Sequence, residues 1–263
     1  MRIVVLFAIF LLPLSAQSVS AQTPVRVPFD CSPEQAEAFG LSCSEDQPCP
    51  VYLELAAAAG SAGRVLVTGN LHTSDTTLFS LLLASEDGGA TWTEPMPRLH
   101  NSTLDQIEFL DSPVGPLVSP MAGPLIGWIG GESIDPLTRN PFLLITADGG
   151  KTWRQKLLFE EAKFGAIAQF HFTSKNDGEL LLDLTQGKTK RSESYATHTG
   201  GESWELQGSG SAIRLAAASR PSDWRVRADA SSATYRVEHA ANPAGPRVWQ
   251  GVANFIIHVT DCH

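Results

Sequence analysis

The sequence predicts an all-β fold built from about four repeated units of four strands each. Three observations lead to this prediction. An eight-residue pattern with two glycines and a closing tryptophan occurs three times, ending at Trp92, Trp153 and Trp204. Each copy follows a short apolar stretch, as expected where a buried strand runs into a turn. The spacing of these tryptophans, with Trp249 as a fourth, leaves about 45–60 residues per unit, which is enough for four short strands.

The repeated pattern has the chemistry of a hairpin turn. The copies read SEDGGATW, TADGGKTW and THTGGESW and begin at Ser85, Thr146 and Thr197. The second glycine of each pair occupies a position where the turn needs positive φ; these residues are Gly89, Gly150 and Gly201. Asp87 and Asp148 are placed to accept hydrogen bonds from N–H groups of their own turns. The closing tryptophan then enters the next strand and reaches the core.

The first two copies resemble the Asp-box, or BNR, repeat S/T-x-D-x-G-x-T-W at every fixed position. The third copy has Thr199 in place of the aspartate, which keeps one acceptor oxygen but loses the charge, so we expect a looser hairpin there. The Asp-box is found in sialidases, in sortilin-like receptors and in photosystem II stability/assembly-factor-like proteins. In these families it implies a β-propeller with the boxes at blade corners, away from the central pocket. The resemblance therefore implies a structural role for the box residues.

On this basis we expect a small β-propeller of about four blades, closed by disulfides. The fourth repeat is degenerate, and its expected strands are 213–217, 224–227, 234–238 and 247–250. A further apolar strand over 254–259 is expected to close the ring, or to form part of a fifth blade shared with residues near 25–29. A short helix is expected over 33–39, with Ser32 as its N-cap.

The start of the chain has the features of a secretory signal peptide over residues 1–21. Arg2 precedes an apolar run from Ile3 to Leu14, and small residues lead to Ala21. The run is shorter than the roughly 20 residues of a membrane-spanning helix. Residues 22–50 are then expected to form a Cys-rich N-terminal cap and residues 51–263 the propeller. We expect a secreted or periplasmic monomer with no membrane span in the mature chain.

The four cysteines predict two disulfides, because their number is even and the expected compartment is oxidising. They are Cys31, Cys43, Cys49 and Cys262. Three connectivities are open at this point. Three cysteines lie near the mature N-terminus and one lies next to the last residue, so at least one bridge should tie the two ends together. The five-residue gap between Cys43 and Cys49 is not zinc-knuckle spacing, and we expect neither a metal site nor a cofactor.

Charge and insertions limit the expected partners. The formal net charge of the chain is −9, which makes nucleic acid an unlikely partner. The longest expected insertion between strands is Gly131–Asn140, and we identify Glu132 and Arg139 in it as a candidate binding loop. The stretch Gly187–Ser192 is a second exposed connection and holds the basic cluster of the chain. The alternative interpretation of both segments is a solvated connection.

Sialidase chemistry is not expected. It needs three arginines around a substrate carboxylate, a tyrosine nucleophile activated by a glutamate, and an aspartate acid/base. The Arg-Ile-Pro motif that supplies the first arginine in sialidases is absent, and the chain is too short for their six blades. The best available set is Tyr235 and Arg236 with Arg225 and Arg227. We interpret it as a blade-packing tyrosine with exposed arginine neighbours.

The segment Gly127–Gly130 (Gly-Trp-Ile-Gly), which precedes the second box, is similar to the blade pattern of the assembly-factor-like propellers. Those relatives are non-enzymatic scaffolds for immature membrane-protein complexes, with more blades and a basic patch that this acidic chain largely lacks. The resemblance implies a non-enzymatic protein-binding or assembly scaffold, with an envelope or membrane protein complex as partner. The alternatives are a glycan-binding or sialidase-like glycoside hydrolase on a reduced propeller, and a structural envelope protein.

Overall fold

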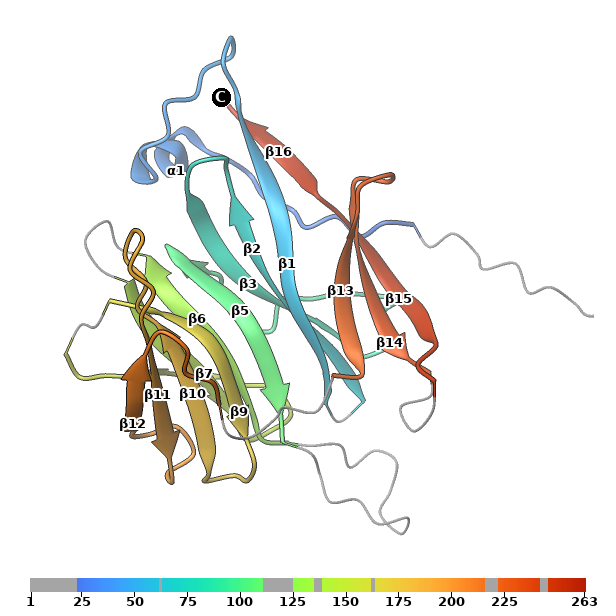
Figure 1. The fold of residues 1–263 in the computed structure, drawn as a ribbon. Coiled ribbons are helices and arrows are strands. Elements are labelled where there is room, and N and C mark those ends of the chain that lie inside the picture. The colour runs from blue at the N-terminus through green and yellow to red at the C-terminus, as the bar shows by residue number, and fades with distance from the viewer. Residues whose placement is uncertain are drawn as a thin grey trace, which may run out of the picture.

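Four antiparallel β-sheets make up the protein (Figure 1). The computed structural model describes residues 23–61, 63–110, 125–134, 139–161, 164–215, 222–241 and 246–263. These residues contain one short helix and sixteen strands. The predicted all-β fold of four blade-like sheets with two disulfides is confirmed.

The first sheet combines strands from both ends of the chain, in the order β16-β1-β2-β3-β4. Its strands are β1 (Cys49–Ser61), β2 (Arg64–His72), β3 (Thr77–Ser85), β4 (Leu99–His100) and β16 (His258–Cys262). The closing Trp92 of the first box was expected to enter the next strand of this sheet. There, only Thr93 forms an isolated bridge, to Ala84, and β4 begins at Leu99.

In the second and third sheets, strands that are neighbours in the sheet are also consecutive in the chain. The second contains β5 (Ser102–Phe109), β6 (Gly127–Ile134), β7 (Arg139–Thr146) and β8 (Arg154–Leu157). The third contains β9 (Ala166–Phe172), β10 (Gly178–Asp183), β11 (Ser192–Thr197) and β12 (Glu205–Gly210). In both sheets the repeated turn joins the third strand to the fourth, as the sequence predicts.

The fourth sheet has three strands within the described residues: β13 (Trp224–Asp229), β14 (Thr234–Ala240) and β15 (Trp249–Ile256). The expected strand over 213–217 is wrong for residues 213–215, and 216–217 lie outside the described residues. Ile213 instead lies beside β12, where a Cβ added to Gly208 would be 3.5 Å from its Cδ1 atom. The glycines at the end of β12 leave room for this apolar side chain, which accounts for the missing pairing.

The C-terminal segment joins the fourth sheet to the first. The strand expected over 254–259 is divided at Ile257, so that β15 pairs with β14 and β16 pairs with β1. Ile257 N–H donates to the Ala233 carbonyl at 3.1 Å, and its carbonyl accepts from Leu53 N–H at 2.7 Å. Val25 forms a parallel bridge to Phe255 on β15. The termini thus complete the first and fourth sheets, and the described residues form no fifth sheet.

Both disulfides lie at the end of the first sheet where Cys49 of β1 pairs with Cys262 of β16. Cys31 pairs with Cys262, 231 residues away, and Cys43 pairs with Cys49 across 6 residues. This connectivity, one of the three left open by the sequence, ties the two ends of the chain together as expected. The helix α1 (Pro33–Ala38) lies between the two bridges and has the predicted Ser32 N-cap, closed by a capping box with Gln35.

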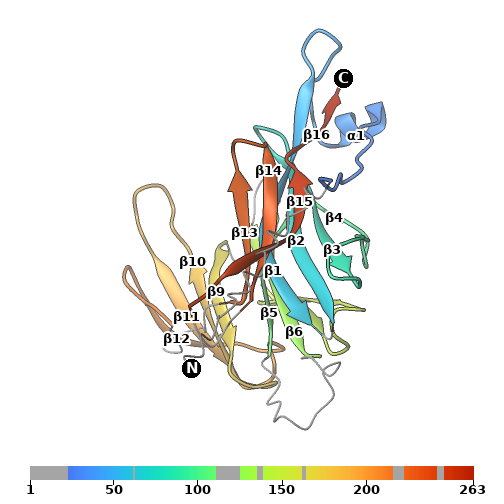
Figure 2. The ribbon, with the colours of Figure 1, turned by 90° about the vertical axis from the view of Figure 1, so that its right-hand side faces the viewer.

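Three clusters of buried apolar side chains hold the sheets together. The first lies between the fourth and first sheets, and includes Leu53 and Phe255. The second joins the first sheet to the second through Leu66 and Phe142, and the third joins the second sheet to the third through Trp128. Among the described residues no such cluster joins the third sheet to the fourth. The two sheets are distinct groups in Figures 1 and 2. In the same residues no helix is long and apolar enough to cross a membrane.

Candidate functional site

The first two boxes are closed networks of local hydrogen bonds. In the first, Asp87 accepts from the Thr91 hydroxyl at 2.6 Å, the Thr91 N–H at 2.9 Å and the Ser85 hydroxyl at 2.8 Å. The Ser85 hydroxyl accepts from Gly89 N–H at 2.8 Å. The Trp92 indole N–H donates to the Gly89 carbonyl at 3.0 Å.

The second box repeats these contacts. Asp148 accepts from the Thr152 hydroxyl at 2.6 Å, the Thr152 N–H at 3.0 Å and the Thr146 hydroxyl at 2.8 Å. Trp153 donates to the Gly150 carbonyl at 3.1 Å. Every polar atom named here bonds within its own turn, so the contacts fit the structural role that the resemblance implies.

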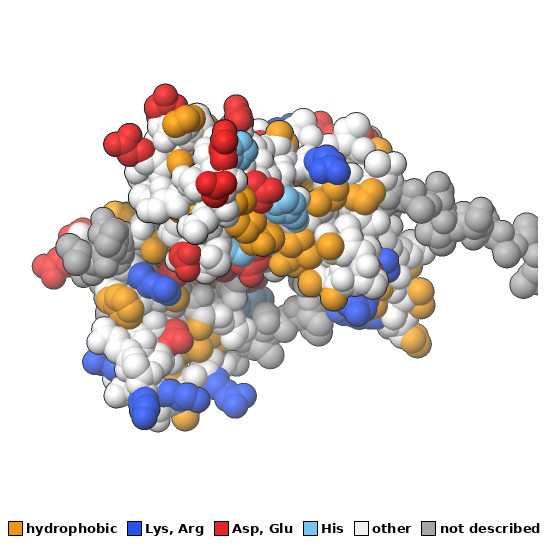
Figure 3. All heavy atoms as spheres, turned by 90° about the horizontal axis from the view of Figure 1, so that it is seen from above, with side chains coloured by type: hydrophobic (Ala, Val, Ile, Leu, Met, Phe, Trp, Pro, Cys, Tyr) orange, Lys and Arg blue, Asp and Glu red, His pale blue; other side chains and the backbone are white. Residues whose placement is uncertain are grey.

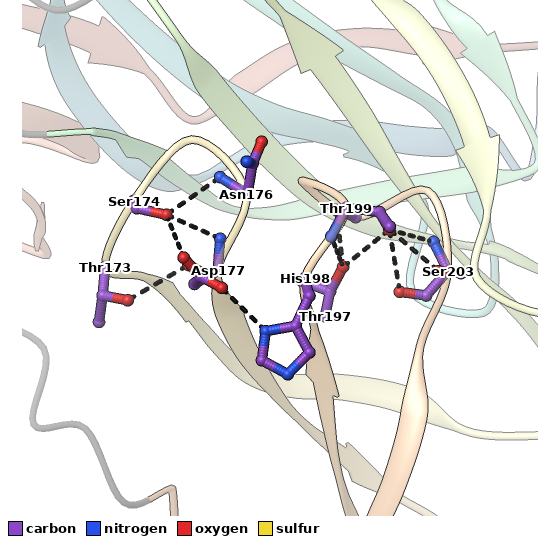
Figure 4. Close-up of polar contacts among 9 residues, drawn as sticks. Thr173, Ser174, Asn176, Asp177, Thr197, His198, Thr199 and Ser203 are labelled. Atoms are coloured by element: carbon purple, nitrogen blue, oxygen red, sulfur yellow. Dashed lines mark hydrogen bonds and ion pairs between the residues drawn. The ribbon is translucent and has the colours of Figure 1, made fainter.

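The third box keeps a similar network around Thr199 (Figure 4). The Thr199 hydroxyl accepts from Ser203 N–H at 3.0 Å, and the Thr197 hydroxyl accepts from Gly201 N–H at 3.1 Å. One bond of the other boxes is lost, because the Trp204 indole nitrogen is buried with no hydrogen-bond partner. Whether this hairpin is looser than the other two stays a prediction.

A carboxylate on the neighbouring turn pairs with the third box through His198. His198 Nδ1 lies 2.8 Å from Asp177 Oδ1 on the neighbouring turn, as Figure 4 shows. Hydrogen bonding to Asp177 raises the pKa of His198. Ser174 in turn donates to the other carboxylate oxygen of Asp177 at 2.6 Å, and this bond is the main cause of the lowered pKa of Asp177.

The second glycine of each box packs against the preceding sheet. A Cβ at Gly89 would lie 2.6 Å from Val252 on the fourth sheet, and one at Gly150 would lie 2.8 Å from Leu66 on the first. A Cβ at Gly201 would lie 3.1 Å from Leu143 on the second sheet. The boxes therefore contact the same three inter-sheet interfaces that hold the apolar clusters.

Box stability should depend on pH. Hydrogen bonds, chiefly from Thr91, lower the pKa of Asp87 from 3.8 to about 2. At Asp148 desolvation is the largest single influence and raises the pKa, but the hydrogen bonds, led by Thr152, together outweigh it and hold the pKa at about 2. A lowered folded-state pKa stabilises the fold above the unfolded-state value, and this contribution disappears as the pH falls toward the folded-state value.

We therefore expect the melting temperature to fall as the pH is lowered from about 4 to about 2, and to fall less in the Asp87→Asn/Asp148→Asn variant. Calorimetry across this range measures both slopes. Asp46→Asn, in an exposed turn near the N-terminus, is the control and should keep the wild-type slope. Parallel slopes for the box variant and the wild type would contradict the assignment.

The candidate binding residues lie at the ends of the sheets opposite the boxes. Glu132 and Arg139 were expected in a loop, which is wrong: β6 continues to Ile134 and β7 begins at Arg139, leaving 135–138 outside the described residues. Arg139 Nη1 donates to Glu132 Oε1 at 3.1 Å. Glu132 is buried, with its residue only 6% exposed, whereas Arg139 is exposed. The structure thus brings the two predicted residues together, on strands.

Two residues that the sequence reasoning missed complete this group. Asp105 lies at a register shift in β5, between Leu104 and Gln106. Such bulges turn a side chain out of the normal alternation. Asp105 accepts from the Thr103 hydroxyl at 2.7 Å and from Asn70 Nδ2, on the first sheet, at 3.5 Å. Asn70 Oδ1 also accepts from Leu104 N–H at 3.0 Å, which fixes it across the interface between the sheets.

The pKa values of the Asp105 and Glu132 carboxyl groups are both raised. Burial raises the pKa of Glu132; Arg139 opposes this effect and the Asp105 charge adds to it. Desolvation also raises the pKa of Asp105, against the hydrogen bonds from Thr103 and Asn70. Solvent reaches the Asp105 side chain, but protein crowds around the carboxylate enough to disfavour its charge. We call Asn70, Asp105, Glu132 and Arg139 the acid cluster.

A row of rings lies at the same end of the first sheet. Tyr52 pairs with His72 on β2 and with His258 on β16, with ring centroids 6.0 and 5.9 Å away. At the corresponding end of the third sheet, the connection between β10 and β11 exposes Lys188, Lys190 and Arg191. Figure 3 looks down on the upper end of Figure 1. Lys and Arg side chains gather at its lower left, and Asp and Glu along its upper edge.

Two of the arginines considered for sialidase chemistry, Arg225 and Arg236, contact carboxylates of their own sheet. Arg225 Nε donates to the buried Glu238 carboxylate at 2.5 Å, and Arg236 lies 3.6 Å from Asp229. Tyr235 packs into the apolar cluster between the fourth and first sheets, and burial raises its pKa. Among the described residues no group of three His, Cys, Asp or Glu side chains could hold a metal ion.

Comparison with protein-family profiles gives no match, and comparison with curated protein sequences gives none either. Among solved structures, the chain is similar to YCF48 bound to a D1 peptide, with a TM-score of 0.38, 18% identity, and coverage of 77% of this chain and 57% of that one. The α-L-arabinofuranosidase Arb93A of Fusarium graminearum gives a TM-score of 0.40 at 15% identity, and the match covers 80% of this chain and 62% of that one. An ulvan lyase of family PL25 gives a TM-score of 0.41 at 10% identity, and the match covers 83% of this chain and 55% of that one.

This chain thus spans less than two thirds of the length of each of these three structures. Membership of the Asp-box family stays a prediction from the box residues.

Proposed function

We propose that the protein is a non-enzymatic binding module that holds a partner protein at the sheet ends opposite the boxes. The observation that best supports this is the acid cluster, in which Glu132 and Arg139 are paired on strand ends beside the solvent-exposed Asp105. Charged groups on strands are positioned more precisely than groups on loops, and lose less conformational entropy on binding. The exposed cations of the β10–β11 connection extend this surface onto the third sheet.

The partner we propose is an envelope or membrane protein complex that the module helps to assemble, in the periplasm or outside the cell. The two disulfides support this location, because such bonds form and persist in oxidising compartments. The signal-peptide features of residues 1–21 support it from the sequence.

The test is affinity purification of the tagged protein after cross-linking in its own envelope, with two charge-reversal variants. Lys188→Glu/Lys190→Glu changes the proposed surface, and Lys151→Glu/Lys175→Glu makes the same change at exposed lysines of the box end. We expect a stoichiometric envelope partner whose recovery drops roughly tenfold in the first variant only. A partner lost equally from both variants, or retained by both, would argue against this surface.

A glycan-active protein is the second candidate, and one observation favours it. Asp105 and Glu132 are neighbouring carboxyl groups, and glycoside hydrolysis uses two carboxyl groups, one of which is a general acid with a raised pKa. Glycan-array binding and sialoside turnover test this idea, with Asp105→Asn and Glu132→Gln as variants. Saturable binding or turnover that both variants abolish would favour the glycan over the protein partner.

A further inference from the structure

A cavity of about 770 Å³ lies apart from the acid cluster, between the N-terminal segment and the first sheet. One wall is the extended chain Arg26–Asp30, and the other contains His258–Thr260 of β16, with Ile256 before it and Phe79 of β3. Figures 1 and 2 show the N-terminal segment passing β15 and β16 on its way to α1. A cavity of this volume suits a small organic ligand.

The wall formed by the N-terminal segment is fastened on both sides of the hollow. At one end Val25 N–H donates to the Asn254 carbonyl at 2.7 Å, and the Val25 carbonyl accepts from Ile256 N–H at 3.1 Å. At the other end Cys31 is bonded to Cys262, directly after the opposite wall. Between them, Arg98 donates to the Pro28 carbonyl at 2.7 Å. The segment is therefore held in place without a ligand, and the cavity is pre-formed.

The lining combines apolar side chains with polar and charged ones, among them Arg26 and Arg98. Phe29 and Phe79 meet edge to face with centroids 5.8 Å apart, and Ile256 and Val259 add aliphatic surface. Arg98 is already bonded to Glu94 at 2.6 and 2.9 Å. The exposed Arg26 side chain makes no hydrogen bond or ion pair within the described residues, so its guanidinium is free to bind an anion.

The lining also contains one acidic residue, Asp30. No ion pair joins Asp30 to Arg26 among the described residues, so the guanidinium is not already neutralised by this carboxylate. The cavity thus offers apolar surface together with an unpaired cation.

We propose that this cavity binds an amphipathic carboxylate, with the apolar body of the ligand against Phe29 and Phe79 and its carboxylate on Arg26. The site is independent of the proposed protein-binding surface. Its ligand class follows from the pairing of a guanidinium with a carboxylate and from the apolar lining.

The experiment titrates the folded, disulfide-bonded chain with decanoate and, separately, with decanol, followed by calorimetry and by NMR of the Ile256 and Val259 methyl groups. We expect saturable binding of decanoate that shifts these methyl signals, and binding of decanol at least about tenfold weaker. Arg26→Gln should weaken decanoate binding about tenfold, while Arg214→Gln, at an exposed arginine outside the cavity, should leave it unchanged.

Three outcomes would overturn the proposal: no saturable binding, equal affinity for decanoate and decanol, or equal weakening by the two arginine variants. The second outcome would leave an apolar pocket with no head-group recognition. The third would show that decanoate is attracted by the positive charge of the protein in general and not by Arg26 in the cavity. Because Arg26 is exposed, its replacement should not unfold the chain, and circular dichroism verifies this.

Discussion

Replacing Cys31 and Cys262 with serine should lower the free energy of unfolding by about 5 kcal/mol. The bridge closes a loop of 231 residues, and in the chain-entropy model the stabilisation grows with the logarithm of loop length. A change of this size is comparable to the whole stability of many domains and corresponds to a fall of about 10–20 °C in melting temperature. Chemical denaturation at low temperature, which keeps the less stable variant folded at the start of the titration, gives the free energy directly.

The Cys43–Cys49 bridge provides a matched control. It closes a loop of only 6 residues, so Cys43→Ser/Cys49→Ser should cost about 2 kcal/mol. Equal losses from the two pairs would show that loop entropy is not the source of the stabilisation. Local packing around α1 and the N-terminal segment would then have to account for it.

Replacing Trp128 with alanine should cost about 3–5 kcal/mol. Its ring is fully buried and stacks on Phe172 of the third sheet with centroids 3.6 Å apart. Its indole N–H donates to the Gly200 carbonyl, in the third box, at 2.9 Å. The substitution therefore leaves a cavity in the interface between the second and third sheets and also removes a hydrogen bond from the turn.

Trp249→Ala is the control for this prediction. Trp249 is only partly buried on β15, with the Arg225 guanidinium 4.0 Å from its ring centroid. We expect a loss of about 1 kcal/mol from the cation–π contact. Urea denaturation of both variants gives the comparison. A loss for Trp128→Ala no larger than that for Trp249→Ala would mean that this interface contributes little to stability.

The sequence predicts the parts of this fold that local chemistry determines. Asp87, with a glycine pair and a tryptophan at fixed spacing, specifies a turn in which the bonds of Ser85, Asp87 and Trp92 lie within eight residues. The apolar stretches before the boxes likewise predict the third strands. The fourth sheet was harder to predict, because Ile213 has the apolar character of a strand residue but contacts β12. That contact depends on side-chain space beside Gly208, which local pattern does not reveal.

The acid cluster likewise could be predicted only in part, because some of its contacts are tertiary. Glu132 and Arg139 were singled out because they lie in the longest expected insertion, and their pairing follows from the antiparallel register of β6 and β7. Asp105 was missed because its position depends on a bulge, and Asn70 because it acts from a different sheet, 35 residues away. The raised pKa values of the two acids come from burial in this tertiary arrangement, so no spacing in the sequence could have indicated them.

Among the described residues, clusters of buried apolar side chains link the four sheets in a linear series. These clusters run from the fourth sheet through the first and second to the third, where the described residues show no further cluster. The fourth sheet is also connected to the first through Ile257, between β15 and β16, whereas the third has such a cluster on one side only in the described part of the chain. In such a series the terminal unit opens at a lower free energy than the rest. The β9–β12 sheet is therefore the natural first unit to detach, and the remaining three form the cooperative folding core.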